Sequence, residues 1–491
     1  MELQFEAGTR RIWRECQHSE EKCLVELEGV VPDVNEDVGR IASIRCNVLL
    51  KSKELNARGL RVGAEVEAVL LCITENADAV QTVRLTKEFE AVIDVPGQTP
   101  DEGQTFLRVL RTEGKVLNPR KLSVSAEIGV EALLWKKEEA VITLLPSEED
   151  AALLCGLKTE AAAVPAAAVG EKSFALTESF VFPAERPAPR RILCAQSAFA
   201  LGETSRIGSR LIVKGTLKLA VLYEAEGFVW PLRQEFTAPL SQIVDLGTED
   251  AVCSTLRCET TSLYFDLADS IGGVSLSTEV HAVLQAVCRT REKIQCLTDA
   301  YSNAMPLRCL SCALSLPQAE ETRSVSLTAS ELIGAGEDCA ELLTVLPALS
   351  RQDRAVSAEL DLLYRTKNGE IAAAHRQLPL RGETPGEDAH ILSLTWKRCD
   401  LQPEGEGVQC DLEAELRFQT WGERTLQALT GAMLDEEHPI DRAALPAFTL
   451  VHVQGESLWE LARRYHSSVA AIETVNPAQE EAGEMLLIPR S

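Results

Sequence analysis

The sequence predicts a mainly β protein, built of tandem all-β repeat modules and ending in a small α+β domain of βααβ order. Three observations predict this class. An alternating apolar and polar segment occurs three times, short polar turns separate such segments, and the residues from 447 onward change to the spacing of short helices. Strands alternate with a period of two and helices repeat every 3.6 residues, so the two patterns can be told apart.

The repeated segment is the main sign of tandem modules. It reads Leu122-Ser-Val-Ser-Ala-Glu-Ile128 and returns as Val274-Ser-Leu-Ser-Thr-Glu-Val280 after a shift of 152 residues. A more diverged third version is Val408-Gln-Cys-Asp-Leu-Glu-Ala414. Strict alternation of this length predicts a half-buried strand in each copy.

A second marker lies upstream in each copy. Ala68-Val-Leu70 matches Ala220-Val-Leu222 at the same shift, and Leu222-Tyr223 matches Leu363-Tyr364. Polar turns follow these markers, and others precede the repeated strands; the third copy has Asn368-Gly369, a strong hairpin signal. Each module is therefore predicted as a hairpin, a connection and a second hairpin. The alternative is three unrelated β-rich segments.

The repeats set the expected domain boundaries, which are 1–145, 170–296 and 311–434 for the three β modules and 447–491 for the last domain. The alanine-rich stretch 146–172 is expected to be a short helix or an extended spacer. The second connection lies near 297–310, and the third is the acidic, proline-bearing stretch 434–446.

The last domain has clear helix signals. A strand is expected at 448–453, then a helix with Ser457 as its N-cap, and a second helix after Ser468 that ends at Asn476-Pro477. A closing strand is expected at 485–489. Trp459, Leu461 and Leu487 are expected to form the core of this domain.

Composition excludes some classes of partner. The net charge is −26, which argues against nucleic acid because phosphate binding needs a basic surface. No stretch reaches 18 consecutive apolar residues, so no transmembrane segment is expected, and the N-terminus lacks the apolar core of a signal peptide. The 15 cysteines are odd in number and scattered, which favours free thiols in a reducing cytosol over a disulfide framework.

Motifs of catalysis and metal binding are missing from the sequence. It contains no P-loop, no His-Glu-x-x-His and no Gly-x-Ser-x-Gly, and its seven histidines, among them His18, His281 and His390, lie far apart. Cys309 and Cys312 form the one Cys-x-x-Cys, but a structural zinc site usually needs two such pairs, so packing is the favoured interpretation. The sequence therefore predicts no enzyme activity, no catalytic residue, no metal ligand and no cofactor.

The last domain resembles a LysM domain. The residues that carry this resemblance are Val453, Gly455, Ser457, Leu458, Trp459, Leu461, Ala462, Tyr465, Ile472, Asn476, Pro477 and Leu487 to Pro489. In that family a groove between two loops holds N-acetylglucosamine units of peptidoglycan or chitin. The resemblance implies a ligand or partner site at Gly455, Glu456, Ser457, Leu458, Asn476, Pro477 and Gly483. Glu456, Glu480 and Glu481 add negative charge beside that groove.

The repeated modules are similar to the SPOCS module of endospore-forming bacteria, on the segment from Pro119 to Glu127 and its copies. Several such modules followed by one LysM domain resemble the layout of SipL-type spore morphogenetic proteins. This layout implies a scaffold for spore-coat assembly in the mother-cell cytoplasm, at the forespore surface. It also implies a partner, the morphogenetic ATPase that polymerises on that surface.

Two other functions remain open at this stage. The chain is alternatively a peptidoglycan-binding protein of the cell wall or cortex. A third hypothesis, a wall hydrolase targeted by LysM, is disfavoured because no catalytic constellation is visible before the last domain.

Overall fold

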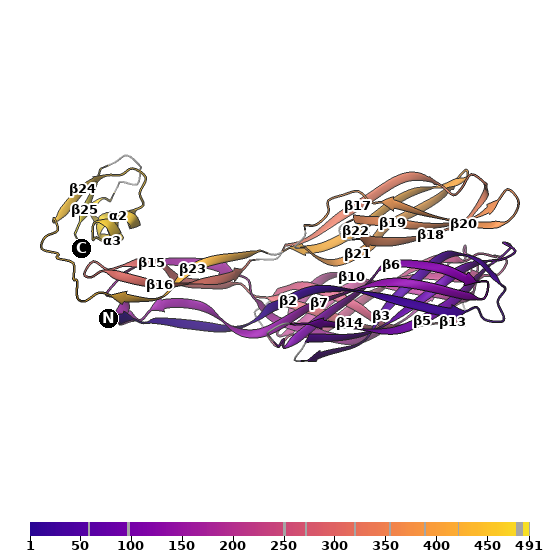
Figure 1. Ribbon diagram of the computed structural model, residues 1–491, viewed down its shortest axis with the longest axis horizontal. Coiled ribbons are helices and arrows are strands. Elements are labelled where there is room, and N and C mark those ends of the chain that lie inside the picture. The colour runs from indigo at the N-terminus through magenta and orange to yellow at the C-terminus, as the bar shows by residue number, and fades with distance from the viewer. Residues whose placement is uncertain are drawn as a thin grey trace.

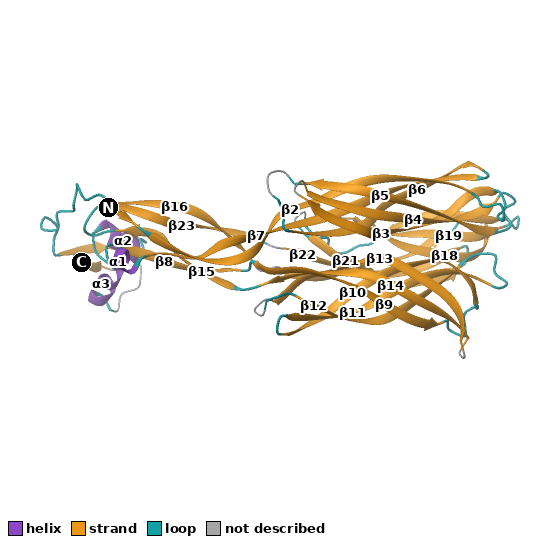
Figure 2. Cartoon of the chain, turned by 90° about the horizontal axis from the view of Figure 1, so that it is seen from below, coloured by secondary structure: helices purple, strands orange, loops and turns teal. Residues whose placement is uncertain are grey.

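The computed structural model shows an elongated molecule with three parts, a head, a stalk and a tail (Figure 1). It describes residues 1–56, 59–95, 99–248, 252–270, 273–318, 321–352, 355–386, 389–420, 422–477 and 485–490. The chain is mainly β, as the sequence predicts, and its few short helices lie at the tail end of the molecule (Figure 2). None of the helices within these ranges has the length and apolar character needed to span a bilayer.

The head consists of three modules with the same strand order. In each module the first strand pairs with the sixth, the sixth pairs with the fifth, and the second, third and fourth form a separate antiparallel sheet. Module 1 contains β2 (Phe5–Val30), β3 (Val38–Asn56), β4 (Gly59–Thr74), β5 (Val80–Asp94), β6 (Glu102–Asn118) and β7 (Lys121–Pro146). Module 2 contains β9 (Ala166–Val181), β10 (Pro189–Ile207), β11 (Arg210–Ala225), β12 (Leu232–Asp245), β13 (Val252–Ser270) and β14 (Gly273–Arg289). Module 3 contains β17 (Glu321–Gly334), β18 (Cys339–Gln352), β19 (Ala355–Thr366), β20 (Ile371–Pro379), β21 (His390–Glu404) and β22 (Gly407–Thr420).

The repeated segment forms the sixth strand of each module. Leu122, Val274 and Val408 are the second residues of β7, β14 and β22, and each of these strands lies between the first and the fifth strand of its module. The alternation predicted from the sequence places every second side chain of these strands in the core of its module. The predicted hairpins correspond to β4–β5 and β6–β7 in module 1, while the first two strands of the module were not foreseen.

The second sequence marker aligns modules 1 and 2 with a shift that is one residue too large. In module 1 the first residue of β4, Gly59, pairs with Asp94, and in module 2 the first residue of β11, Arg210, pairs with Asp245. Both partners differ by 151 residues, so the two middle sheets correspond at an offset of 151. A shift of one residue turns a side chain to the opposite face of a sheet. Accordingly, Leu70 packs inside its own module, whereas Leu222 packs between modules.

The three modules share a core where their middle sheets meet. Leu71, Leu222 and Leu363 lie at equivalent positions of β4, β11 and β19, and all three are buried in this shared core. Hydrogen bonds between modules add to the contact. Arg45 donates from Nη2 to the Leu346 carbonyl at 2.7 Å, and Asn47 donates from Nδ2 to the Ala195 carbonyl at 3.0 Å. The head is therefore one packed unit.

The stalk is made of three two-stranded ribbons, one from each module. The first part of β2 pairs with the last part of β7. The other ribbons are β8 (Cys155–Ala163) with β15 (Glu292–Tyr301), and β16 (Leu307–Pro317) with β23 (Glu423–Leu434), to which β1 (Glu2–Leu3) adds a short edge. Apolar side chains of all three ribbons pack together, among them Leu144, Ile294 and Leu426.

The segments that the sequence predicts as connections between modules largely form strands of the stalk and of module 2. The stretch 146–172 contains one short helix, α1 (Glu148–Ala151), but its alanine-rich part is neither a helix nor a spacer, because it forms β8 and the start of β9. The expected boundaries at 170, 296 and 311 fall inside β9, β15 and β16. The alanine side chains 161, 163, 166 and 168 face the interior, so a stretch that looks like a linker is a buried pair of strands.

The tail follows an irregular connection after β23. It contains β24 (Phe448–His452), α2 (Leu458–Arg464), α3 (Val469–Val475) and β25 (Met485–Pro489), with β24 and β25 antiparallel. Leu461, Ile472, Leu486 and Ile488 are buried in its core. Leu487 is only half-buried, because the closing strand directs its neighbours Leu486 and Ile488 inward instead.

Candidate functional site

The first tail loop is held in place by capping of α2. The Ser457 hydroxyl accepts a hydrogen bond from the Glu460 amide at 3.2 Å, and the Glu460 carboxylate accepts one from the Ser457 amide at 2.8 Å. This reciprocal capping box fixes the chain entering the helix. Gly455 has a φ of 103°, a conformation that side chains disfavour.

Glu456 closes the same loop. Its carboxylate accepts hydrogen bonds from the Gln454 amide at 2.9 Å and from Arg464 Nη1 at 3.0 Å. The hydrogen bond from the Gln454 amide, with that from Arg464, lowers the pKa of Glu456. Leu458 is half-buried against the tail core, while Gly455 and Ser457 are exposed.

The second tail loop starts at a side chain that bridges two elements. Asn476 Nδ2 donates to the Leu487 carbonyl at 2.8 Å, and Asn476 Oδ1 accepts from the Leu487 amide at 3.0 Å. Asn476 thus fastens the end of α3 to β25, and Pro477 beside it is exposed. Gly483, Glu480 and Glu481 lie outside the described residues.

The tail rests on the end of the stalk. Trp459 donates from Nε1 to Asp299 Oδ2 at 2.9 Å, and its ring meets the Tyr301 ring edge-on with centroids 4.9 Å apart. Tyr301 donates from its hydroxyl to the Ser467 carbonyl at 2.8 Å, and Asn303 Nδ2 donates to the same carbonyl at 3.0 Å. Trp459 is half-buried and packs against the tail core, as expected, and it also contacts β15 of the stalk, which the sequence did not predict.

A second polar site lies inside the head, where side chains of modules 1 and 2 meet. Arg257 on β13 is almost wholly buried, lies over the Phe106 ring at 3.8 Å and forms an ion pair with Glu131 on β7 at 3.0 Å. Burial alone would raise the pKa of Glu131, but Arg257 and then His18 outweigh it and hold the value at about 2. Glu131 is thus a buried carboxylate kept in its charged form.

The strand positions around this ion pair are equivalent in the three modules. Gln104, Arg257 and His390 lie on β6, β13 and β21, opposite Leu133, Gln285 and Gln419 of the neighbouring strands. Gln285 Nε2 donates to the Thr105 carbonyl at 2.9 Å, which ties module 2 to module 1. Thr255 donates to Gln419 Oε1 at 2.6 Å, which ties module 2 to module 3.

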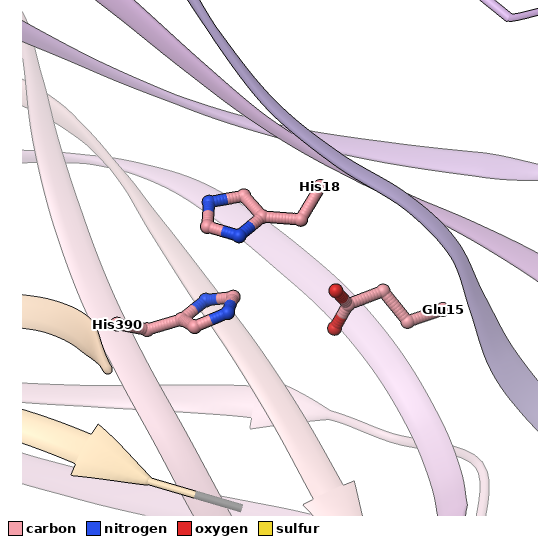
Figure 3. A group of neighbouring side chains, drawn as sticks. All are labelled: Glu15, His18 and His390. Carbon is pink, nitrogen blue, oxygen red and sulfur yellow. The ribbon is translucent and has the colours of Figure 1, made fainter. Parts of the chain in front are cut away.

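Two histidines that are distant in the sequence meet at the same place. The rings of His18 on β2 and His390 on β21 lie with centroids 3.9 Å apart, and the Glu15 carboxylate is beside them (Figure 3). Among the described residues these three form the one group of His, Cys, Asp or Glu side chains that offers three ligand atoms within 4.8 Å of one another. Sequence reasoning missed this group because nothing in the spacing of the histidines indicates contact between modules.

A pocket of about 410 Å³ opens between the modules beside Arg257. Phe106, Glu259 and Arg417 line it together with Arg257. Glu259 accepts a hydrogen bond from the Leu107 amide at 3.4 Å, and burial raises the pKa of its carboxyl to about 8. The pocket therefore holds one carboxyl that is largely protonated at neutral pH.

The cysteines whose side chains are described are all free thiols. Cys309 and Cys312 lie on β16 in the stalk, where both are half-buried, and Cys309 donates to the Ala300 carbonyl at 3.7 Å. Burial raises the pKa of the Cys309 thiol. Neither belongs to the group of close ligand atoms found in the described part of the chain.

These features define an elongated β protein with a three-module head, a fused stalk and a docked α+β tail. No model of a known protein family matches the chain, and no curated protein or solved structure is significantly similar to it.

Proposed function

We propose that the chain is a non-enzymatic scaffold of spore-coat assembly, with SPOCS-like modules in its head and a LysM-like tail that captures a protein partner. By the resemblance of the domain layout, the partner is the morphogenetic ATPase on the forespore surface, and the chain acts in the mother-cell cytoplasm. The peptidoglycan-binding alternative assigns the same tail to a glycan.

The observation that carries the proposal is the way the tail is mounted. Asp299 and Tyr301 hold α2 through Trp459, and the same carboxylate accepts from Arg463 at 2.8 Å. Gly455, Ser457 and Pro477 stay exposed. A binding module held at the end of a long stalk presents these exposed residues to a partner at the end of the molecule away from the head (Figure 1).

Charge favours a protein over a neutral sugar as the ligand. The sequence places Glu480 and Glu481 close to Pro477, and the whole chain carries a net charge of −26. Charged groups at the rim of a protein interface set orientation and association rate, whereas neutral sugars make little use of them. A single tail also lacks the repetition from which polymer-binding modules gain avidity.

The test compares two ligands on the full chain. Immobilised full-length protein is exposed to the purified ATPase, and separately the free protein is sedimented with purified peptidoglycan. We expect capture of the ATPase that weakens with salt and is lost in a chain ending at residue 446. We expect E480K/E481K to weaken capture, while E404K/E406K, an equal charge change in the exposed turn at the end of β21, leaves it unchanged.

The alternative function gives the opposite outcome. Sedimentation with peptidoglycan that depends on the tail, together with no capture of the ATPase, would contradict the scaffold proposal and support glycan binding.

A further inference from the structure

A β-bulge places Glu15 and His18 on the same side of β2. The register of β2 against β7 shifts between Glu15, which pairs with Trp135, and Gln17, which pairs with Leu134. Residues three apart on a regular strand point to opposite faces, but one extra residue restores the same face. Cys16 is that extra residue. The local backbone therefore aims a carboxylate and an imidazole at one point.

Module 3 supplies a second imidazole at that point. His390 is the first residue of β21, and its ring lies against that of His18 with centroids 3.9 Å apart and planes inclined by 30°. His390 is buried and His18 is exposed, so the group lies at the edge of the protein interior and is open to solvent on the side of His18. The ligand atoms of Glu15, His18 and His390 all lie within 4.8 Å of one another (Figure 3).

The chemistry of this set is that of a zinc site with an open position. Two imidazole nitrogens and one carboxylate oxygen are a common protein ligand set for Zn²⁺, which leaves the fourth position to water. The contacts of the ligand residues with their neighbours also fit a metal site, because His18 Nε2 lies 3.1 Å from Glu131 Oε1. A carboxylate on one ring nitrogen orients the other nitrogen toward a metal and increases its basicity.

The charges around the set are compatible with a cation. The carboxylate of Glu131 lies 3.1 Å from His18, and of the two arginines that act on His390, Arg257 and Arg289, the first is paired with that carboxylate at 3.0 Å.

We propose that Glu15, His18 and His390 form a Zn²⁺ site that fastens module 1 to module 3. Two ligands come from β2 and one from β21, so the ion crosses the contact between the first and the last module. Module 2 is joined to module 1 by the hydrogen bond from Gln285 to Thr105, and to module 3 by the hydrogen bond from Thr255 to Gln419. Zinc adds a further link between modules 1 and 3, beside the hydrogen bond that Arg45 donates to the Leu346 carbonyl.

The test uses metal-stripped full-length protein and ZnCl₂ as the probe. Calorimetric titration should show one equivalent bound with the highest affinity, and Zn²⁺ should raise the Tm. We expect E15Q and H18A each to weaken binding by at least the roughly 10–100-fold that is typical of losing an outer-shell partner. H281A removes an exposed histidine of β14 and should bind like the natural chain.

Two further measurements distinguish zinc held at this site from zinc held by thiols and from a folding defect in the variants. Because 15 cysteines could compete for zinc, Co²⁺ is bound in its place, and its spectrum should lack thiolate charge-transfer bands. The Tm of each variant without metal shows whether the substitution itself affects folding. Unchanged zinc affinity in both E15Q and H18A, thiolate bands with Co²⁺, or no binding by the natural chain would overturn the proposal.

Discussion

Asp299 on the stalk accepts a hydrogen bond from the Trp459 indole of the tail at 2.9 Å, although the two residues belong to different parts of the molecule. The same carboxylate accepts from Arg463 Nη1 at 2.8 Å. Both donors come from one face of α2, a helix of seven residues. This one acidic side chain therefore fixes α2 on the stalk, beside the hydrogen bonds that Tyr301 and Asn303 donate to the Ser467 carbonyl.

Replacing Asp299 by alanine should release the tail. Both donors of α2 lose their acceptor, and hydrogen bonds to charged groups contribute about 1.5–3 kcal/mol each at most. We expect faster proteolysis in the connection 435–447 and unchanged secondary structure by circular dichroism. D269A, at an exposed position of β13, is the matched control and should be cleaved like the natural chain. Equal cleavage of D299A and D269A would show that Asp299 does not hold the tail.

Replacing Glu131 by glutamine should destabilise the head. The substitution leaves Arg257 buried without its counter-charge, which costs about 3–5 kcal/mol in comparable cases. The pKa of Glu131 is about 2, below the ordinary 4.5, so the stability from its charge is present above pH 4.5 and is lost as the pH falls toward 2.

Denaturant titration at several pH values tests this expectation. The difference between the natural chain and E131Q should be largest near neutral pH and should shrink at acid pH. E139Q changes an exposed glutamate further along β7 and should cost less than about 0.5 kcal/mol. A difference that does not depend on pH would contradict the assigned role of the carboxylate charge.

Replacing Glu259 by glutamine should stabilise the protein at alkaline pH. Burial raises the pKa of Glu259 to about 8, so the folded chain keeps a proton that the unfolded chain releases near pH 4.5. Its contribution to stability is therefore greatest below pH 4.5 and declines as the pH rises to 8. Because the pocket beside it admits water, we expect E259Q to gain only about 1–2 kcal/mol over the natural chain at pH 9. An equal loss of stability in the natural chain and in E259Q across this range would contradict the prediction.

The extent of thiol alkylation should differ between the folded and the denatured protein. Burial raises the pKa of Cys46 and Cys72 to about 12 and that of Cys194 to about 11, so these thiols should resist alkylation in the folded protein at neutral pH. In denaturant without a reducing agent, all 15 cysteines should be modified, as counted by mass spectrometry. A higher count after reduction would reveal disulfides and would favour an exported protein.

The sequence predicts the strands better than their register. Alternation in the repeated segment identifies β7, β14 and β22, because each is flanked by two strands of its module and has one face in a core. Residues 68–73 of β4 are instead buried on both faces, so they carry no alternation that could fix a register to one residue. The sequence therefore matches Leu222 with Leu70, whereas its structural counterpart is Leu71, which meets it in the shared core.

The candidate sites differ in how far local sequence determines them. The cap of α2 at Ser457 is predictable because it depends on residues within one helical turn. The meeting of His18 with His390 depends on a bulge at Cys16 and on the packing of the first module against the last. Neither the bulge nor that packing has a signature in a single sequence.

The equivalent positions 104, 257 and 390 show what is gained by joining three copies in one polypeptide. A ring of three identical chains would gather three arginines or three histidines around its centre, and their mutual repulsion would oppose assembly. Here the positions carry a neutral amide, a guanidinium with its carboxylate partner and an uncharged imidazole. Joining the copies in one chain therefore allows equivalent positions to carry different side chains, so a guanidinium, its carboxylate partner and an uncharged imidazole occur where the modules meet.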